Sequence, residues 1–290
     1  MSRARPEIVS TSLPLHVTEL RDPGVTSTDV FLMVHGYAGS SYTWHHWSPK
    51  LAERGRVLLV DLKGFGEAPK PDDGRYRTTD LADLIVELVR ELDLWRLTLV
   101  GHSLGGGLSL ISALRLIDQR EQRLDRMVLV AAPAYRQRLP PLVPLSNLPT
   151  FSSLTAKALG VRTIVRSVLR SIVFDRERVT EEQVEAYARA LEEPEGLRAA
   201  MDVGRSIVPD NLDDLVRRYP EIDVPTLLLW GEQDPVIPLW VGERLADDLP
   251  RARLVVMPEC GHVPPEEHPD ASFAHLAAFL DETAPATDTP

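Results

Sequence analysis

Six short runs of apolar residues recur along the chain, separated by longer stretches with helical spacing. The runs are Val30–Val34, Arg56–Val60, Leu97–Val100, Met127–Ala131, Thr226–Trp230 and Arg253–Met257. Because they are continuously apolar and do not alternate with polar positions, they predict strands that are buried on both faces. Between the second and third runs, apolar residues recur every three or four positions from Leu81 to Leu92, which predicts a helix. This order indicates an α/β fold with a mostly parallel central sheet and flanking helices. We expect one or two antiparallel strands before Val30.

The rhythm of strand and helix breaks over residues 133–222, where helical patterns occur without a strand pattern. This stretch opens with a proline-rich connector, Leu139–Pro144. Further on, Thr180–Gln183 has the form of a capping box and predicts a helix from Val184. We interpret the stretch as a helical cap that is inserted into the sheet domain.

The insertion divides the chain into two predicted domains. The α/β core comprises residues 1–132 and 223–282, and the cap comprises residues 133–222. The last residues, 283–290, are polar and proline-containing and are expected to be disordered. A chain of 290 residues can bury one sizeable core, so length does not call for a further domain.

Composition and charge exclude several classes of function. The net charge of −11 disfavours binding to nucleic acid or to an anionic membrane surface, since both require clustered Lys and Arg. No run approaches the ~20 apolar residues that span a bilayer, and the N-terminus lacks the apolar stretch of a secretory signal, so a cytoplasmic location is the default expectation. The single cysteine, Cys260, excludes an internal disulfide and a zinc site built on several cysteines, and it is expected to be a small buried residue. The sequence does not distinguish a monomer from a small homo-oligomer.

The strongest chemical signal is a G-x-S-x-G motif that runs from Gly101 to Gly105, directly after the Leu97–Val100 strand and before a helical stretch. In a nucleophile elbow of this kind the serine, here Ser103, projects from a strained turn at the end of the sheet. Gly101 and Gly105 are required because side chains there would collide with the neighbouring helix and strand. The following helix directs its first amides toward developing negative charge. Ser103 is therefore the predicted nucleophile.

A serine hydroxyl is a weak nucleophile and needs a base, which a third group must orient. Asp234 follows the Thr226–Trp230 strand, and His262 follows the Arg253–Met257 strand. Because parallel strands carry their active sites at their carboxyl ends, we expect these side chains to meet Ser103 at one edge of the sheet. His262 is the predicted general base, and Asp234 is the acid that orients it.

Other residues compete for the roles of acid and base. Glu232 precedes Asp234 by two positions, but it suits a solvent-facing site, whereas Asp-Pro ends the turn. The alternative acid position after the Met127–Ala131 strand holds no carboxylate, which favours Asp234. His268 stands before a proline and His275 lies within the expected closing helix, so surface or packing roles are favoured for both.

Two backbone N–H groups are expected to bind the oxyanion of a tetrahedral intermediate. Leu104 provides one. Tyr37 provides the other, from the loop after the Val30–Val34 strand, where Gly36 lets the chain turn sharply. The Tyr37 side chain is also a candidate for the substrate pocket, as is His102, although a turn this tight should point His102 away from the nucleophile.

Three aromatic residues follow this loop: Tyr42, Trp44 and Trp47. They are typical of a substrate-binding platform and equally of helix packing. Both interpretations stay open for Trp44, which is a candidate pocket residue, and packing is favoured for Trp47.

Together these motifs resemble the α/β-hydrolase superfamily, in its capped serine hydrolase branch, which is esterase- or lipase-like. The resemblance extends over almost the whole chain and rests on His35-Gly36, Asp61–Gly66, Gly101–Gly106, Gly231–Asp234, Gly261-His262 and Glu267–Pro269. It implies the α/β-hydrolase fold with an inserted helical cap. The family usually has a serine at the position of Glu67, so the rim of that loop departs from the pattern. The cap sequence resembles nothing in particular.

Within the family, Ser103 argues against haloalkane dehalogenases and epoxide hydrolases, which use aspartate as nucleophile. The resemblance implies hydrolysis of a small-molecule carboxylic ester through an acyl-enzyme, without a metal or organic cofactor. The alternatives are a lactonase, a cofactor-free perhydrolase, or a C–C hydrolase of vinylogous diketo acids. In the last case cap arginines would bind the substrate carboxylate. The candidates are Arg162, Arg166 and Arg170, but a stripe of arginines on a helix is more often a solvated face, and that interpretation is favoured here. A ligand receptor without turnover is disfavoured by the complete set of Ser, His and Asp.

Overall fold

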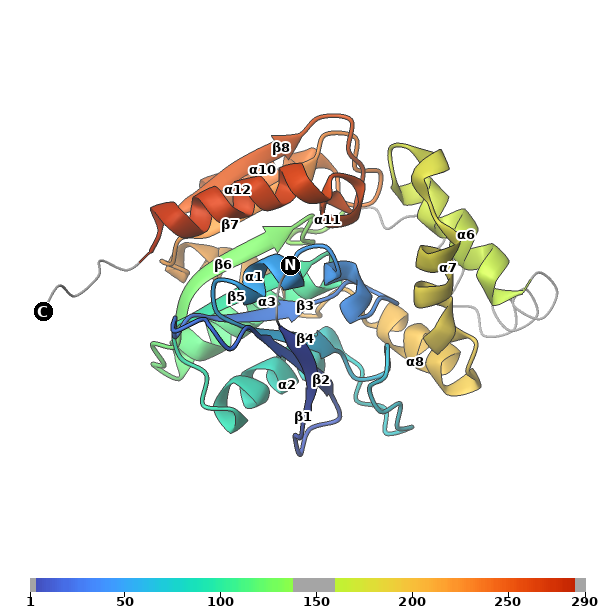
Figure 1. Ribbon diagram of the computed structural model, residues 1–290, viewed down its shortest axis with the longest axis horizontal. Coiled ribbons are helices and arrows are strands. Elements are labelled where there is room, and N and C mark those ends of the chain that lie inside the picture. Colours follow the sequence, from blue (N-terminus) through green and yellow to red (C-terminus); the bar gives the residue numbers. More distant parts are fainter. Residues whose placement is uncertain (1–3, 138–159, 285–290) are drawn as a thin grey trace, which may run out of the picture.

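The computed structural model describes residues 4–137 and 160–284. A single eight-stranded sheet has the order β1-β2-β4-β3-β5-β6-β7-β8 and carries helices on both faces (Figure 1). Its strands are β1 (Arg5–Val9), β2 (His16–Arg21), β3 (Val30–Val34), β4 (Arg56–Asp61), β5 (Leu97–His102), β6 (Leu124–Val130), β7 (Thr226–Gly231) and β8 (Ala252–Met257). The strands from β4 to β8 in this order are parallel, whereas β1 and β2 pair antiparallel. The mostly parallel sheet and the leading antiparallel strands are confirmed.

Side chains of the central strands alternate between two hydrophobic cores. In β3, Leu32 and Val34 face the core that α2, α3 and α10 cover, whereas Phe31 and Met33 pack with α1 and α12 on the other face. This period of two, with a core on each side, explains why the strand sequences are apolar throughout. The covering helices are α1 (Ser48–Ala52), α2 (Thr78–Glu91), α3 (Leu104–Asp118), α10 (Leu239–Asp248) and α12 (Pro269–Glu282).

The last strand of the sheet, β8, departs from the prediction of burial on both faces. Most of its residues are partly exposed, and Val256 is 39% exposed. The reason is its position at the edge of the sheet, where no further strand covers it. The apolar run in this strand therefore predicted more burial than the structure shows.

Helical segments fill the described part of the insertion between β6 and β7. They are α6 (Val161–Ile172), η2 (Arg176–Arg178), α7 (Glu181–Ala188), η3 (Arg189–Leu191), α8 (Pro194–Arg205), α9 (Leu212–Arg218) and η4 (Tyr219–Glu221). The predicted capping box is present, since Thr180 Oγ1 accepts from the Gln183 amide at 3.1 Å, but the helix already begins at Glu181. The insertion packs on itself through a small apolar cluster of α6 and α7. It lies beside one end of the sheet (Figure 1).

Two predicted segments fall outside the described residues: the proline-rich connector at 139–144, and positions 285–290 of the expected disordered tail. The domain boundaries remain predictions. Within the described ranges, no helix is both long and apolar enough to span a membrane.

Candidate active site

The turn between β5 and α3 has the geometry of a strained elbow. Ser103 occupies it with φ 49° and ψ −122°, a backbone conformation that non-glycine residues rarely adopt. A Cβ atom on Gly101 would lie 2.4 Å from the Gly105 carbonyl oxygen, and one on Gly105 would lie 2.2 Å from the Val34 oxygen. Both positions therefore require glycine, since the helix and a neighbouring strand approach each other across the turn.

The structure brings Ser103, His262 and Asp234 together at the carboxyl ends of β5, β8 and β7. His262 Nδ1 lies 2.8 Å from Asp234 Oδ2, and His262 Nε2 lies 2.9 Å from Ser103 Oγ. Because the carboxylate accepts, Nδ1 carries the proton and Nε2 is the acceptor for the serine hydroxyl. His262 is 4% exposed and Asp234 is 7% exposed, so the bond between them is shielded from water, whereas the bond to Ser103 is partly buried. This geometry permits proton transfer from the serine to the imidazole.

The second oxygen of Asp234 is held by the backbone. Oδ1 accepts from the amides of Val236 at 2.7 Å and Ile237 at 2.9 Å, which fixes the carboxylate plane and leaves Oδ2 for the histidine. The rival acid Glu232 is exposed and accepts from the Gln233 side chain. The solvent-facing position expected for Glu232 is confirmed.

His102, the residue before the nucleophile, binds the backbone of the loop that carries His262. Its Nε2 donates to the His262 carbonyl oxygen at 2.8 Å. Burial lowers the pKa of His102 to about 3, so its ring is neutral. It also contributes to the wall of the cavity described below. Its role is thus to hold the His262 loop rather than to carry a charge.

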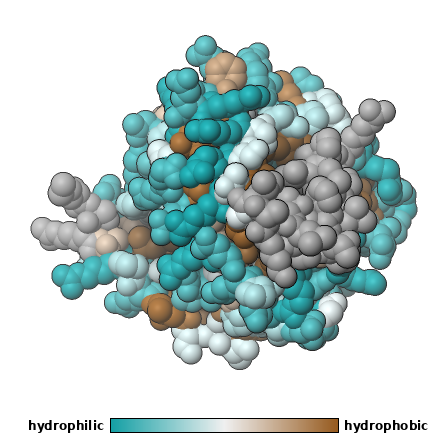
Figure 2. Space-filling model, turned by 90° about the vertical axis from the view of Figure 1, so that its right-hand side faces the viewer, coloured by the Kyte–Doolittle hydropathy of each residue, from teal (hydrophilic) through white to brown (hydrophobic). Residues whose placement is uncertain are grey.

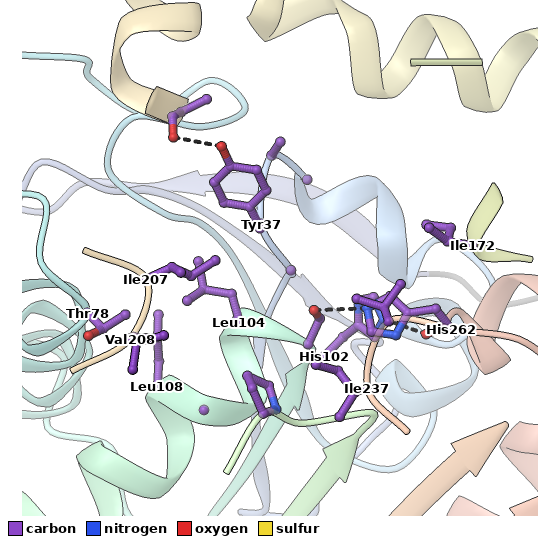
Figure 3. Close-up of a pocket in the computed structure, with 18 of the residues that line it drawn as sticks. Tyr37, Thr78, His102, Leu104, Leu108, Ile172, Ile207, Val208, Ile237 and His262 are labelled. Carbon is purple, nitrogen blue, oxygen red and sulfur yellow. Dashed lines mark hydrogen bonds between the residues drawn. The ribbon is translucent and has the colours of Figure 1, made fainter. Parts of the chain in front are cut away.

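The loop after β3 packs directly against the elbow. A Cβ atom on Gly36 would lie 3.1 Å from Ser103 Cβ, so glycine permits this close approach. Tyr37 follows in that loop, and Leu104 is the first residue of α3, where backbone N–H groups point out of the helix. The assignment of the Tyr37 and Leu104 amides to an oxyanion hole remains a prediction. The Tyr37 hydroxyl donates to the Ala200 oxygen of α8 at 2.7 Å and so bridges to the insertion (Figure 3).

A cavity of about 380 Å³ opens between the insertion and the sheet, beside Ser103 and His262 (Figure 3). Aliphatic side chains from both sides form most of its wall, among them Leu104, Leu108, Val165, Val168, Leu169, Ile172, Ile207, Val208 and Ile237. None of the described residues in this wall is Lys, Arg, Asp or Glu. The cavity therefore suits an uncharged, apolar group.

Of the two interpretations left open for Trp44, core packing is the one observed, so its candidacy as a pocket residue is wrong, and the packing role favoured for Trp47 is confirmed. Trp44 is fully buried, and its ring lies 5.6 Å from that of Trp47 in the core beneath the sheet. Tyr42 stacks on His45 instead of facing the cavity. The short helix η1 (Ser41–Trp44) turns the tryptophans inward, which the sequence pattern could not distinguish from a surface platform. The aromatic wall is formed by Tyr37 together with Tyr187 of α7 and others from the insertion.

The cap arginines lie on the outer face of α6. Arg162 pairs with Glu192 at 2.8 Å and Arg166 with Glu181 at 2.5 Å, while Arg170 is exposed. Figure 2 shows the side of the molecule on which the insertion lies in Figure 1. The side chains coloured there are mainly hydrophilic, with hydrophobic ones between them. These arginines are absent from the described cavity wall. The favoured interpretation as a solvated helix face is confirmed.

Four other residues singled out in the sequence lie away from the cavity wall. Glu67 is exposed and pairs with Arg189 at 3.4 Å, so the departure from the family's serine forms a contact to the insertion. His268 Nε2 donates to the Glu259 oxygen, and His275 is exposed on α12. Cys260 is buried, as predicted. Among residues 4–137 and 160–284, no cluster of three or more His, Cys, Asp or Glu could hold a metal ion.

Glu266, on the short helix α11 (Pro264–Glu267), connects the core to the insertion and was not singled out in the sequence. It accepts hydrogen bonds from the Tyr187 hydroxyl and from Gln183 Nε2, the latter at 2.9 Å. Tyr187 Oη also lies 3.0 Å from Thr43 Oγ1. Desolvation raises the pKa of Glu266 to about 7 despite these two donors. The contact between α11 and α7 therefore contains a carboxyl group that titrates near neutrality.

In the wild type, the free energy of unfolding is expected to fall as pH rises towards neutrality, and replacing Glu266 by glutamine should remove this fall. Between pH 4.5, the ordinary pKa of this carboxyl, and about pH 7, the folded protein retains a proton that the unfolded chain has released. The free energy of unfolding of the wild type therefore decreases as pH rises through this window and then levels off. The variant should gain about 2 to 4 kcal/mol relative to the wild type between pH 4.5 and pH 8 in urea unfolding. Glu185→Gln, an exposed acid on α7, is the matched control, and a Glu266→Gln difference independent of pH would contradict the expectation.

Comparison with known proteins agrees with the fold. The model of one family, described as the alpha/beta hydrolase fold, matches residues 29–269. A 2-hydroxymuconate semialdehyde hydrolase from Pseudomonas sp. is 30% identical over 272 residues, which cover 91% of this chain and 90% of that protein.

Two solved structures show the same architecture. A meta-cleavage product hydrolase from Pseudomonas fluorescens superposes with a TM-score of 0.73 at 26% identity, over 92% of this chain and 94% of that one. A thermophilic esterase from Thermogutta terrifontis superposes with a TM-score of 0.76 at 23% identity, over 97% of this chain and 100% of that one. Proteins named for two different reactions thus share this fold.

Proposed function

The chain belongs to the alpha/beta hydrolase fold family, and from that premise we propose that it is a serine hydrolase that cleaves uncharged carboxylic esters with a sizeable apolar group. The observation that carries the proposal is the hydrogen-bonded series Ser103–His262–Asp234 at the wall of a cavity without described charged residues. The three residues supply an activated serine nucleophile, and the apolar cavity favours uncharged substrates beside it.

In the proposed reaction Ser103 Oγ attacks the ester carbonyl while His262 Nε2 takes its proton. Asp234 stabilises the imidazolium, and the amides of Leu104 and Tyr37 bind the oxyanion of the tetrahedral intermediate. His262 then protonates the leaving alcohol, and an acyl-enzyme forms on Ser103. His262 then takes a proton from a water molecule, whose oxygen attacks the acyl group. The bond from the acyl group to Ser103 Oγ breaks, His262 returns the proton to that oxygen, and the carboxylic acid is released.

A second candidate is hydrolysis of a C–C bond in a diketo acid, which uses the same three residues. It is favoured by the relative at 30% identity that is named as a 2-hydroxymuconate semialdehyde hydrolase. Against it stands the cavity wall, because a cation stabilises a buried substrate carboxylate best and the described wall has no Lys or Arg. The ester reaction is therefore our first choice.

A panel of p-nitrophenyl esters tests the preference. We expect kcat/KM to rise about fourfold for each methylene added to a straight acyl chain until the cavity is filled, since each buried methylene contributes about 0.8 kcal/mol. An ester of equal length that ends in a carboxylate should be at least about 100-fold poorer, because its charge would be buried without a partner. Higher kcat/KM on a diketo acid than on every neutral ester would overturn the proposal in favour of the second candidate.

A further inference from the structure

The carboxylate of Glu267 binds the backbone on both sides of His262. Its oxygens accept from the Gly261 amide at 2.9 and 3.0 Å and from the Val263 amide at 3.0 Å. The side chain is buried, with 8% of the residue exposed. These bonds fix the Cys260–Gly261 peptide unit and the His262–Val263 peptide unit, the second of which adjoins the Cα atom of His262.

The same carboxylate also binds the insertion. Its Oε2 accepts from the Phe174 amide at 2.8 Å, just after the end of α6. In the same place the His262 amide donates to the Ile172 oxygen at 2.8 Å, and Figure 3 shows Ile172 beside His262. The backbone of His262 is thus held by the core from one side and by the insertion from the other.

Gly261 lets the two backbones approach each other. A Cβ atom there would lie 2.4 Å from the Ile172 oxygen and 2.9 Å from the Phe174 nitrogen. Any side chain would push residues 172–174 away from the histidine loop. The absence of a side chain at this position is therefore a condition of the contact.

We propose that Glu267 is a positioning residue that couples the docking of residues 172–174 to the orientation of His262. The imidazole aligns with Ser103 only while this segment is seated on the histidine loop. The inference rests on the proposed function, in which His262 is the base. Glu267 is outside the described cavity wall, so it acts through the histidine and not on the substrate.

The coupling predicts a loss of turnover rather than of substrate binding. A glutamine at position 267 has a single acceptor oxygen, and its amide group would face at least one of the backbone N–H donors. A displacement of the base by about 1 Å costs on the order of 100-fold in rate. We therefore expect Glu267→Gln to lower kcat on a neutral ester about 10- to 100-fold, with KM within about threefold of the wild type.

The experiment uses the full chain and a small fluorophosphonate that labels Ser103. The final stoichiometry counts intact sites, and kcat, KM and the labelling rate constant are expressed per labelled site. Gly261→Ala is the second variant, because it leaves the carboxylate intact and displaces the insertion. Glu282→Gln, at an exposed ion pair with Arg253 on the end of α12, is the matched control and should match the wild type.

Both variants should label fully but slowly, with kcat and the labelling rate constant reduced by similar factors. A Glu267→Gln protein with a lower melting temperature but wild-type kcat per labelled site would reduce the residue to a structural role and overturn the inference. If Glu267→Gln yields no labelled sites, Gly261→Ala tests the coupling on its own. A wild-type kcat per labelled site in Gly261→Ala would also overturn the inference. Absence of both labelling and ester turnover in the wild type would instead refute the proposed function.

Discussion

Replacing Ser103 by alanine is expected to lower kcat on a neutral p-nitrophenyl ester by about ten-thousand-fold to a million-fold. Its Oγ is the atom that lies 2.9 Å from His262 Nε2, and alanine removes it without adding volume. Without it, no acyl-enzyme can form, and only the oxyanion donors and the cavity remain to accelerate attack by water. The same variant should lose labelling by a fluorophosphonate completely.

The substitution should leave the fold intact, because alanine tolerates the strained elbow no worse than serine does. The melting temperature and direct binding of a non-hydrolysable ester analogue check this. Ser112→Ala provides a matched control, since Ser112 is a buried serine on α3, the helix that follows Ser103, and it donates to the Ala82 oxygen. Retention of more than about one per cent of kcat in Ser103→Ala would require a different nucleophile.

The parts of the site that lie at strand ends could be predicted from sequence. Ser103 sits in a local motif whose glycines report a backbone constraint, and Asp234 and His262 each follow a strand that the apolar pattern identifies. Parallel pairing then brings them to one edge of the sheet without any knowledge of side-chain packing. The sheet itself follows from the same apolar runs.

What escaped prediction depends on contacts between distant parts of the chain. The burial of Trp44 is decided by how η1 packs against β3, β4 and α11, and no local pattern encodes that. Val165 and Leu169 line the cavity, but a helical apolar stripe has the same spacing whether it faces a core or a cavity. Tyr187 meets Glu266 across 79 positions of sequence.

One signal for the coupling was present in the sequence. Two consecutive acids, Glu266 and Glu267, follow the predicted base within five residues and directly after two prolines. Carboxylates so close to a base that must be shielded from water need partners, and the structure provides backbone amides for Glu267 and cap side chains for Glu266. Adjacent charged residues beside a predicted base are thus worth testing as supports of that base.

Replacing Asp234 by asparagine is expected to lower kcat about ten-thousand-fold, although the new side chain has the same shape. The cause is the fixed orientation of the amide. The position of Oδ1 accepts from the Val236 and Ile237 amides, so the asparagine oxygen must occupy it. The asparagine NH₂ group is then left facing His262 Nδ1.

A donor at that position requires Nδ1 to be the acceptor, which moves the proton to Nε2. Nε2 then cannot take the proton of Ser103, and the base is lost while all heavy atoms keep their places. Steady-state kinetics of Asp234→Asn measure the effect, and Glu232→Gln, a change at the exposed rival acid, should stay within about twofold of the wild type. If Asp234→Asn kept a tenth of kcat, the tautomer of His262 would not be set by this carboxylate, and the base would need another partner.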